Sequence, residues 1–196
     1  MKTLAILLLS ALSCVAQIGG LRSPAFVGNL APRAASGPNA WYDVETVANT
    51  DTDANGTVDA LEWSSVTVVT GGSATKARIY LGDNTGTPSV NLKMGIYAAG
   101  GGAVLASGSV ANAGSAGDNA YVEVTFGTPV NVSSSTTYLV AWIADAGALD
   151  LTYRFKNGSG NWKAKLSYGY SNFPGTLPTE ETFSLSRGYA VSLFVQ

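Results

Sequence analysis

Residues 121–144 read YVEVTFGTPVNVSSSTTYLVAWIA, and two patterns in this stretch predict the fold class. Residues 121–126 (YVEVTF) alternate between apolar and polar side chains, which is typical of a strand with one buried face and one solvated face. Residues 137–144 (TYLVAWIA) are almost continuously apolar, which predicts a strand in the centre of a sheet. The stretch therefore predicts two neighbouring strands in a β-rich domain.

Three side chains of the second strand are expected to share one face. Tyr138, Val140 and Trp142 follow each other with the period of two that places side chains on the same side of a strand. We therefore expect Trp142 to lie in the core. Gly127-Thr128-Pro129 predicts a turn between the two strands.

The rest of the chain repeats this pattern of short strands separated by turn residues. Further strands are predicted at residues 63–70, 75–81, 91–98, 104–110, 149–156 and 161–170, and one within 182–196. The NGSG sequence at 157–160 predicts a hairpin between two of them, and residues 40–48 (AWYDVETVA) could form two helical turns. Eight to ten short strands predict an all-β domain, an antiparallel β-sandwich of the jelly-roll or immunoglobulin-like type.

Composition excludes several classes of function. The chain has 196 residues, a net charge of −2, and no histidine. The weak charge argues against a nucleic-acid binder, which would need a strongly basic surface. The lack of histidine excludes Ser-His-Asp and Cys-His catalysis, and zinc or copper sites that use histidine. We find no motif for catalysis, and the isolated carboxylates that could form an acid–base pair mostly fall at turns: Asp83, Asp118, Glu123, Asp145 and Asp150.

The N-terminus has the form of a secretory signal peptide. Residues 1–16 carry a lysine, an apolar run and then small residues, which predicts export and cleavage after Ala16. The alternatives are an uncleaved anchor and a lipoprotein signal, because Cys14 follows Ala11-Leu12-Ser13. Cleavage would leave a secreted, extracellular protein without cysteine and without a membrane segment. Residues 17–40 are expected to form an extended arm or linker, and residues 41–196 the single β-sandwich domain.

Residues 51–62 (DTDANGTVDALE) stand out in a chain that is otherwise poor in charge. Closely spaced carboxylates repel each other unless a cation neutralises them, and hard cations such as calcium prefer oxygen ligands. The expected ligands of a calcium ion are Asp51, Asp53, Asn55, Thr57 (through its carbonyl), Asp59 and Glu62. The alternative is a solvated turn, in which Asn55-Gly56 is simply a hairpin signal.

The spacing of this loop resembles the calcium loop of the EF-hand family over all twelve positions. The resemblance implies the calcium ligands and does not extend beyond residues 51–62. The residues after the loop are typical of a strand, and no second loop is present, so neither the helix–loop–helix fold nor a sensor role is implied. The expected role of calcium is structural.

Aromatic and basic residues near the C-terminus provide a second candidate site. Trp162, Tyr170, Asn172 and Phe173 lie at predicted turns, where rings can stack on sugars and amides can donate hydrogen bonds; the alternative is that the rings belong to the core. Four basic residues are predicted on the opposite face of the 149–170 hairpin, either as a solvated face or as a site for an anionic glycan or an acidic neighbouring subunit: Arg154, Lys156, Lys163 and Lys165.

In size and strand pattern the chain is similar to the accessory β-sandwich modules of carbohydrate-active and surface proteins. The resemblance implies a secreted, non-catalytic, calcium-stabilised module that binds a glycan or another cell-surface polymer. The alternative is a structural subunit of an extracellular fibre, surface layer or phage virion. In that case self-assembly would occur by addition of the arm, residues 17–40, as a strand to a neighbouring copy.

Overall fold

The computed structural model describes nine segments of the chain: residues 39–44, 52–55, 60–82, 89–116, 119–145, 152–157, 162–170, 173–179 and 187–196. All of them belong to one compact unit, Ala35–Gln196. No helix among these residues is long and apolar enough to cross a membrane.

The described segments contain strands and one short 3-10 turn. The strands are β1 (Ala40–Asp43), β2 (Thr52–Asn55), β3 (Leu61–Val68), β4 (Gly72–Tyr80), β5 (Leu92–Ala98), β6 (Gly101–Val110), β7 (Tyr121–Val132), β8 (Thr136–Ala144), β9 (Thr152–Asn157), β10 (Trp162–Lys165), β11 (Arg187–Tyr189) and β12 (Val191–Val195), with the turn η2 at Ala113–Ala116.

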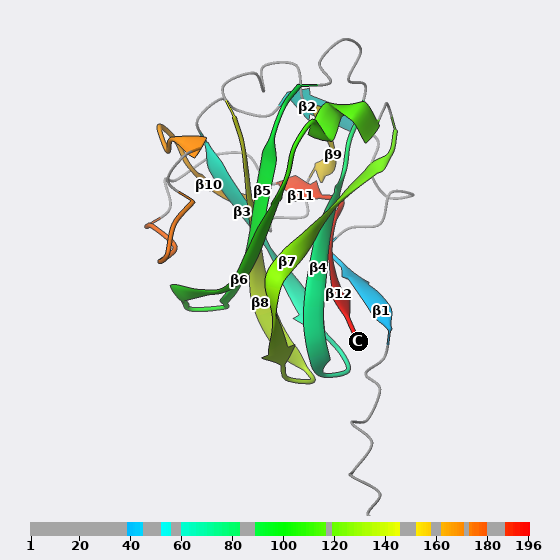
Figure 1. Ribbon diagram of the computed structural model, residues 1–196, viewed down its shortest axis with the longest axis vertical. Coiled ribbons are helices and arrows are strands. Elements are labelled where there is room, and N and C mark those ends of the chain that lie inside the picture. Colours follow the sequence, from blue (N-terminus) through cyan, green and yellow to red (C-terminus); the bar gives the residue numbers. More distant parts are fainter. Residues whose placement is uncertain are drawn as a thin grey trace, which may run out of the picture. The chain divides into compact units, whose positions relative to one another are not determined.

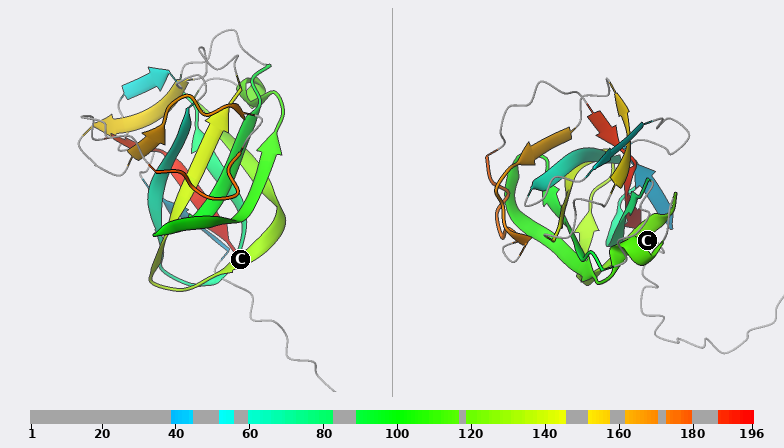
Figure 2. Two further views of the ribbon diagram at one scale, coloured as in Figure 1. Left: turned by 90° about the vertical axis from the view of Figure 1, so that its left-hand side faces the viewer. Right: turned by 90° about the horizontal axis from the view of Figure 1, so that it is seen from above.

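These strands form three antiparallel sheets (Figures 1 and 2). A four-stranded sheet has the order β1-β12-β4-β7, and a five-stranded sheet has the order β10-β3-β8-β5-β6. A three-stranded sheet, β11-β9-β2, lies at one end of these two, as the upper part of Figure 1 shows. The predicted fold class, an all-β antiparallel sandwich, is confirmed, and β8 is the central strand of its sheet as expected.

The main core lies between the two larger sheets. Tyr138, Val140 and Trp142 of β8 all point into it, as their spacing predicts, and Trp142 is fully buried. Tyr153 and Phe155 of the small sheet belong to the same core, so this sheet closes one end of it. Burial of each large apolar side chain contributes about 1.5–3 kcal/mol to folding, so the layered packing holds the sheets together.

β6 and β7, which are edge strands of the two larger sheets, pass close to each other. A Cβ atom added at Gly108 of β6 would lie 2.1 Å from the carbonyl oxygen of Thr125 in β7. Since real Cβ atoms cannot come so close to a carbonyl, only glycine fits at this position. The side of the sandwich formed by β6 and β7 therefore depends on that glycine.

Two local predictions are wrong. The predicted turn at Gly127-Thr128-Pro129 lies within β7, where the register against β4 jumps from Lys76↔Thr125 to Ala74↔Val130. The extra residues form a bulge, which accommodates a proline because its missing N–H is not needed in the ladder. Residues 40–43, predicted as helical turns, form β1 and pair with β12.

The predicted hairpin between 149–156 and 161–170 is also wrong. β9 pairs with β2 and β11, whereas β10 pairs with β3, so the two strands belong to different sheets. β10 ends at Lys165, and Ser167 has a positive φ of 56°, which ends the extended conformation. The turn signal is local, whereas strand partners are decided by tertiary packing.

The outer face of the five-stranded sheet is covered by a second core, which we call the covered face. Its floor comes from β3, β5 and β8, and the chain after β10 packs over it: Leu61, Trp63, Tyr97, Ala141 and Ile143 lie beneath Tyr168, Tyr170, Phe173 and Leu177. The hydroxyl of Tyr97 donates a hydrogen bond of 2.6 Å to the carbonyl of Pro174. This contact fixes the covering segment to the sheet.

Candidate functional site

The outer face of the four-stranded sheet carries aromatic and charged side chains that no other part of the described chain covers completely. Successive residues of a strand point to opposite faces, so the residues between the core positions of β1, β12, β4 and β7 gather there. We call this surface the aromatic face; its members are Trp41, Asp43, Lys76, Arg78, Tyr80, Tyr121, Glu123, Ser192 and Phe194. All four rings are partly exposed.

Arg78 lies at the centre of the aromatic face, between two rings. Its guanidinium carbon is 4.0 Å from the ring centroid of Trp41 and 3.8 Å from that of Tyr121. Trp41 comes from β1 and Tyr121 from β7, on opposite sides of β4 in the sheet. A guanidinium at these distances is attracted by the electron-rich faces of the rings, so Arg78 holds Trp41 and Tyr121 in place.

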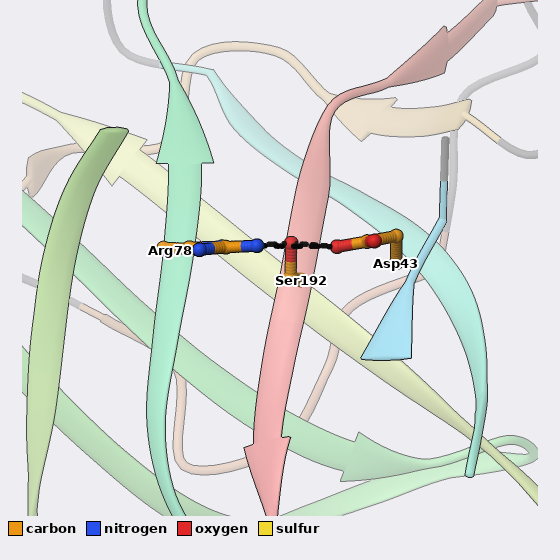
Figure 3. A network of polar contacts seen from close by, with 3 residues as sticks. All are labelled: Asp43, Arg78 and Ser192. Carbon is orange, nitrogen blue, oxygen red and sulfur yellow. Dashed lines mark hydrogen bonds and ion pairs between the residues drawn. The ribbon is translucent and has the colours of Figure 1, made fainter. Parts of the chain in front are cut away.

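A row of polar contacts across three strands fixes Arg78 in turn (Figure 3). Its Nε donates to the hydroxyl of Ser192 at 3.2 Å, and that hydroxyl donates to Oδ1 of Asp43. Arg78 Nη2 lies 3.6 Å from the same carboxylate oxygen. Ser192 is fully buried, while the side chains of Arg78 and Asp43 are 18% and 28% exposed. The network is therefore partly shielded from solvent, which strengthens it relative to an open surface pair.

The charges of the aromatic face neutralise each other. Asp43 faces Arg78, and Lys76 Nζ lies 3.3 Å from Oε2 of Glu123, a pair with side chains 38% and 44% exposed. The face thus has two cations and two carboxylates, and each cation lies beside a carboxylate. Such a surface has no net field to attract an ionic ligand.

The rings form two pairs on either side of Arg78. Trp41 and Phe194 have centroids 5.0 Å apart, and Tyr80 and Tyr121 meet edge to face at 4.9 Å. Burial raises the pKa of Tyr121 above its ordinary value, with the nearby charges of Arg78 and Asp43 acting in opposite directions. Its hydroxyl is therefore protonated at neutral pH and can donate as well as accept a hydrogen bond.

The structure separates the predicted ligand residues from each other. Trp162 points from β10 towards the main core, whereas Tyr170 and Phe173 pack on the covered face. The ammonium of Lys93 lies 4.2 Å from the ring centroid of Tyr170. The same ammonium donates a hydrogen bond of 2.9 Å to the main-chain carbonyl of Tyr170. Asn172 lies outside the described residues.

Glu62 is buried in the aromatic end of the main core. Its Oε2 accepts a hydrogen bond of 2.8 Å from Nε1 of Trp142, and the residue is 3% exposed. Burial raises the pKa of Glu62 to about 7, although the Trp142 hydrogen bond, the charge of Arg187 and a hydrogen bond with Trp162 oppose the rise. Desolvation is the dominant cause because it disfavours the charged carboxylate. Sequence reasoning did not foresee this buried position.

The calcium loop remains a prediction. Asp51, Thr57 and Asp59 lie outside the described residues, and for Asp53 and Asn55 the structure describes the backbone. That backbone forms strand β2, which pairs with β9. Within the described segments no group of three or more Asp, Glu, Cys or His residues could hold a metal ion.

The predicted basic face is divided between two sheets. Arg154 and Lys156 belong to β9, and Lys163 and Lys165 to β10. Of the predicted acid–base candidates within the described segments, Glu123 pairs with Lys76 and Asp145 accepts a hydrogen bond of 2.6 Å from the Asn91 amide. Asp83, Asp118 and Asp150 lie outside those segments.

Comparison with protein families gives a match over much of the chain. A family model described as a domain of unknown function (DUF4082) matches residues 64–189, which is more than half of the chain. The chain belongs to the DUF4082 family. No curated protein matches the chain.

The DUF4082 match contains only part of the aromatic face. Lys76, Arg78, Tyr80, Tyr121 and Glu123 lie inside the matched residues. The contributions of β1 and β12 to the face lie outside them, since β1 precedes residue 64 and β12 follows residue 189. The network around Arg78 is thus completed by strands that flank the DUF4082 match.

Sequence reasoning missed the aromatic face, although part of its signal was visible. Lys76, Arg78 and Tyr80 alternate with the apolar residues of β4, and Tyr121 and Glu123 alternate in the same way in β7. Each strand by itself shows only that one face is polar. The order of the strands in the four-stranded sheet, which places β4 between β7 and β12, is needed to see that these side chains form one surface.

Proposed function

We propose that the chain is a non-catalytic β-sandwich module that binds an uncharged carbohydrate chain through the aromatic face. The observation that carries this proposal is the set of four partly exposed rings, two of them in contact with Arg78, on a sheet face whose charges neutralise each other. Sugar rings present C–H groups that are attracted to the electron-rich faces of aromatic rings. Their hydroxyl groups can exchange hydrogen bonds with the polar side chains in between.

The contacts of Arg78 hold part of the aromatic face in place before a ligand binds. Arg78 contacts two rings and two polar side chains, so the rings lose little conformational freedom when a ligand arrives. The outer surface of a sheet also suits an extended polymer better than a small molecule, which favours a concave pocket. The aromatic face therefore fits a chain of several sugar units.

The test is affinity measurement against neutral polysaccharides, with matched tyrosine variants. Tyr121→Ala should weaken binding by about tenfold or more, because loss of an aromatic anchor commonly costs more than 1 kcal/mol. Tyr168→Ala, which removes a similarly half-buried ring from the covered face, should retain binding. Equal affinity of wild type and Tyr121→Ala, or no binding to any neutral glycan, would contradict the proposal.

The structural-subunit alternative predicts a different result in light scattering. In that case the chain would form polymers that dissociate when residues 17–38 are deleted, a deletion that leaves β1 intact. A monomer that binds glycan with or without these residues favours recognition.

Calcium binding by residues 51–62 is a separate proposal, which rests on the ligand spacing in the sequence. Melting the protein in calcium and in chelator tests it, because a ligand that binds only the folded state raises the midpoint with its concentration. Asp51→Ala/Asp59→Ala should abolish the rise. These two positions are better probes than Glu62, whose removal would also disturb the core.

A further inference from the structure

A cleft of about 270 Å³ lies on the outer face of the five-stranded sheet, between β6 and the chain segment that covers this face. Its β6 side is formed by Val104 and residues 107–109 (Ser-Gly-Ser), and its other side by residues 173–175 (Phe-Pro-Gly). Lys93 of the neighbouring strand β5 also lines it. We call it the serine cleft.

The two sides of the serine cleft are fixed to each other and to the sheet. The N–H of Val104 donates a hydrogen bond of 2.7 Å to the carbonyl of Gly175. The hydrogen bond from the hydroxyl of Tyr97 to the carbonyl of Pro174 holds the same segment on β5. The cleft is thus formed before any ligand binds, which lowers the entropic cost of binding.

Two hydroxyl groups of β6 line the cleft. Ser107 lies opposite Gly95 and Ser109 opposite Lys93, positions that alternate with the core residues of β5, so both serine side chains point to the outer face. Both serines are exposed, and neither hydroxyl has a hydrogen-bond partner in the part of the chain that the structure describes. A hydroxyl can donate and accept, so both groups are available to a polar ligand.

The ring of Phe173 adds apolar surface beside Ser107. It rests on Gly95, where an added Cβ atom would lie 2.6 Å from the ring, and its centroid is 6.4 Å from that of Tyr97. These contacts fix the ring on the sheet, while Phe173 remains partly exposed and lines the cleft. The cleft therefore offers a fixed apolar surface next to a free hydroxyl.

The charge of the cleft is already engaged within the protein. Lys93 is the one charged residue among the described residues that line it, and its ammonium contacts both the carbonyl and the ring of Tyr170. A ligand thus meets hydroxyl groups, main-chain groups and an aromatic ring. An uncharged molecule with hydroxyl groups on one side and C–H groups on another matches these features, and a sugar ring has that form.

We propose that the serine cleft binds one uncharged sugar unit, with Ser107 and Ser109 as partners of its hydroxyl groups and Phe173 as the ring on which its C–H groups pack. The volume is slightly below the range of about 300–1,000 Å³ typical of drug-sized ligands, so the cleft has room for one unit and not for a chain. The site lies on a different sheet from the aromatic face and shares no residue with it, so it goes beyond the proposed function and does not depend on it.

The experiment is an amide-resolved NMR titration with the methyl glycosides of glucose, galactose and mannose, and with N-acetylglucosamine. At least one of these sugars should shift the amide signals of residues 107–109 in a saturable way. Ser107→Ala/Ser109→Ala should weaken its binding by about tenfold, as expected for the loss of two hydrogen bonds. Phe173→Leu, which keeps apolar contact with Gly95, should weaken it by about threefold or more.

Matched controls and further ligands separate the serine cleft from its rivals. Ser65→Ala should bind like wild type, because Ser65 lies on the outer face of the same sheet but does not line the cleft. Tyr121→Ala should leave the shifts of residues 107–109 unchanged while it weakens polysaccharide binding, so failure of the aromatic face and failure of the cleft give different results. The methyl glycoside of glucuronic acid should bind no more tightly than that of glucose.

Three results would overturn the proposal. The first is the lack of a saturable shift at residues 107–109 with all four neutral sugars. The second is tighter binding of the glucuronic acid glycoside, which would show that the cleft selects a charge. The third is wild-type affinity in Ser107→Ala/Ser109→Ala, provided that the spectrum of this variant is that of a folded protein.

Discussion

The outer faces of the two large sheets differ in how far the described chain covers them. On the five-stranded sheet, the chain after β10 folds back and buries the rings of Trp63 and Tyr97 in a second core. On the four-stranded sheet, the rings of Trp41 and Tyr121 remain partly exposed around Arg78. Both faces are aromatic, but the described part of the chain covers one and leaves the rings of the other partly exposed.

The difference separates rings that stabilise the fold from rings that are available for binding. A ring in the covered face gives up its contact with water when the chain folds, and contributes to stability through burial. A ring on the aromatic face keeps part of that contact, so its contribution to stability is smaller. Clustered exposed aromatic residues are the feature that marks interaction surfaces.

The largest expected effect compares one tyrosine from each face. Tyr97→Ala should lower the free energy of unfolding by about 3–5 kcal/mol, as for other large-to-small changes in a core, because Tyr97 is fully buried. Tyr80→Ala should cost about 1 kcal/mol, the scale of one exposed ring pair. Urea denaturation measures both. Similar losses in the two variants would show that the aromatic face is built for stability.

The next prediction contrasts the buried carboxylate Glu62 with the paired surface carboxylate Glu123. Because the folded state raises the pKa of Glu62 from 4.5 to about 7, folded protein holds the proton more tightly than unfolded protein does. The contribution of Glu62 to the stability of the wild type should therefore be most favourable below pH 4.5. It should fall as the pH rises to about 7 and stay constant above that pH. The loss across this window is about 3 kcal/mol.

Glu62→Gln removes that dependence while keeping an oxygen for the Trp142 hydrogen bond. The variant should gain stability relative to wild type between about pH 4 and about pH 8, measured as denaturation midpoints at each pH. Glu123→Gln should change stability by less than about 1 kcal/mol at any pH, since exposed ion pairs contribute little. A Glu62→Gln curve parallel to that of wild type would refute the buried placement.

The smallest effect concerns how tightly the covering segment is fitted. A Cβ atom at Gly95 would lie 2.6 Å from the ring of Phe173, so Gly95→Ala should displace that ring and cost about 1–3 kcal/mol. Gly127→Ala, where the nearest atom is 3.9 Å away, should be close to neutral. Thermal melts compare the two. Equal midpoints would mean that Phe173 does not pack on β5 as described.

Prediction from the sequence succeeded where a residue's environment follows from its own strand. The apolar run of 137–144 predicts a central strand, and the period of two predicts that Trp142 is buried; both are confirmed. Failures arose where the partner strand decides the outcome. The NGSG turn signal does not reveal that β10 pairs with β3, because the alternating residues of β10 suit either neighbour.

The same distinction, between features set within one strand and features set by its partners, applies to the candidate sites. The aromatic face combines residues from four strands, and β1 among them was predicted as helical. The covered face depends on the chain after β10, where residues 166–170 were predicted to continue a strand but leave the sheet and pack over it. For Glu62, position in the acidic stretch indicated a ligand, while its alternation with Leu61 and Trp63 determined that it points inward.

The row of Asp43, Ser192 and Arg78 has a consequence for the order of folding. Asp43 and Ser192 are 149 positions apart in the chain, whereas β5 and β6 are neighbours joined by a tight hairpin. Closing a long loop costs more chain entropy than closing a short one, and contacts of high sequence separation form slowly. We therefore expect the β5–β6 hairpin to form early and the aromatic face to assemble among the last parts, when β12 enters between β1 and β4.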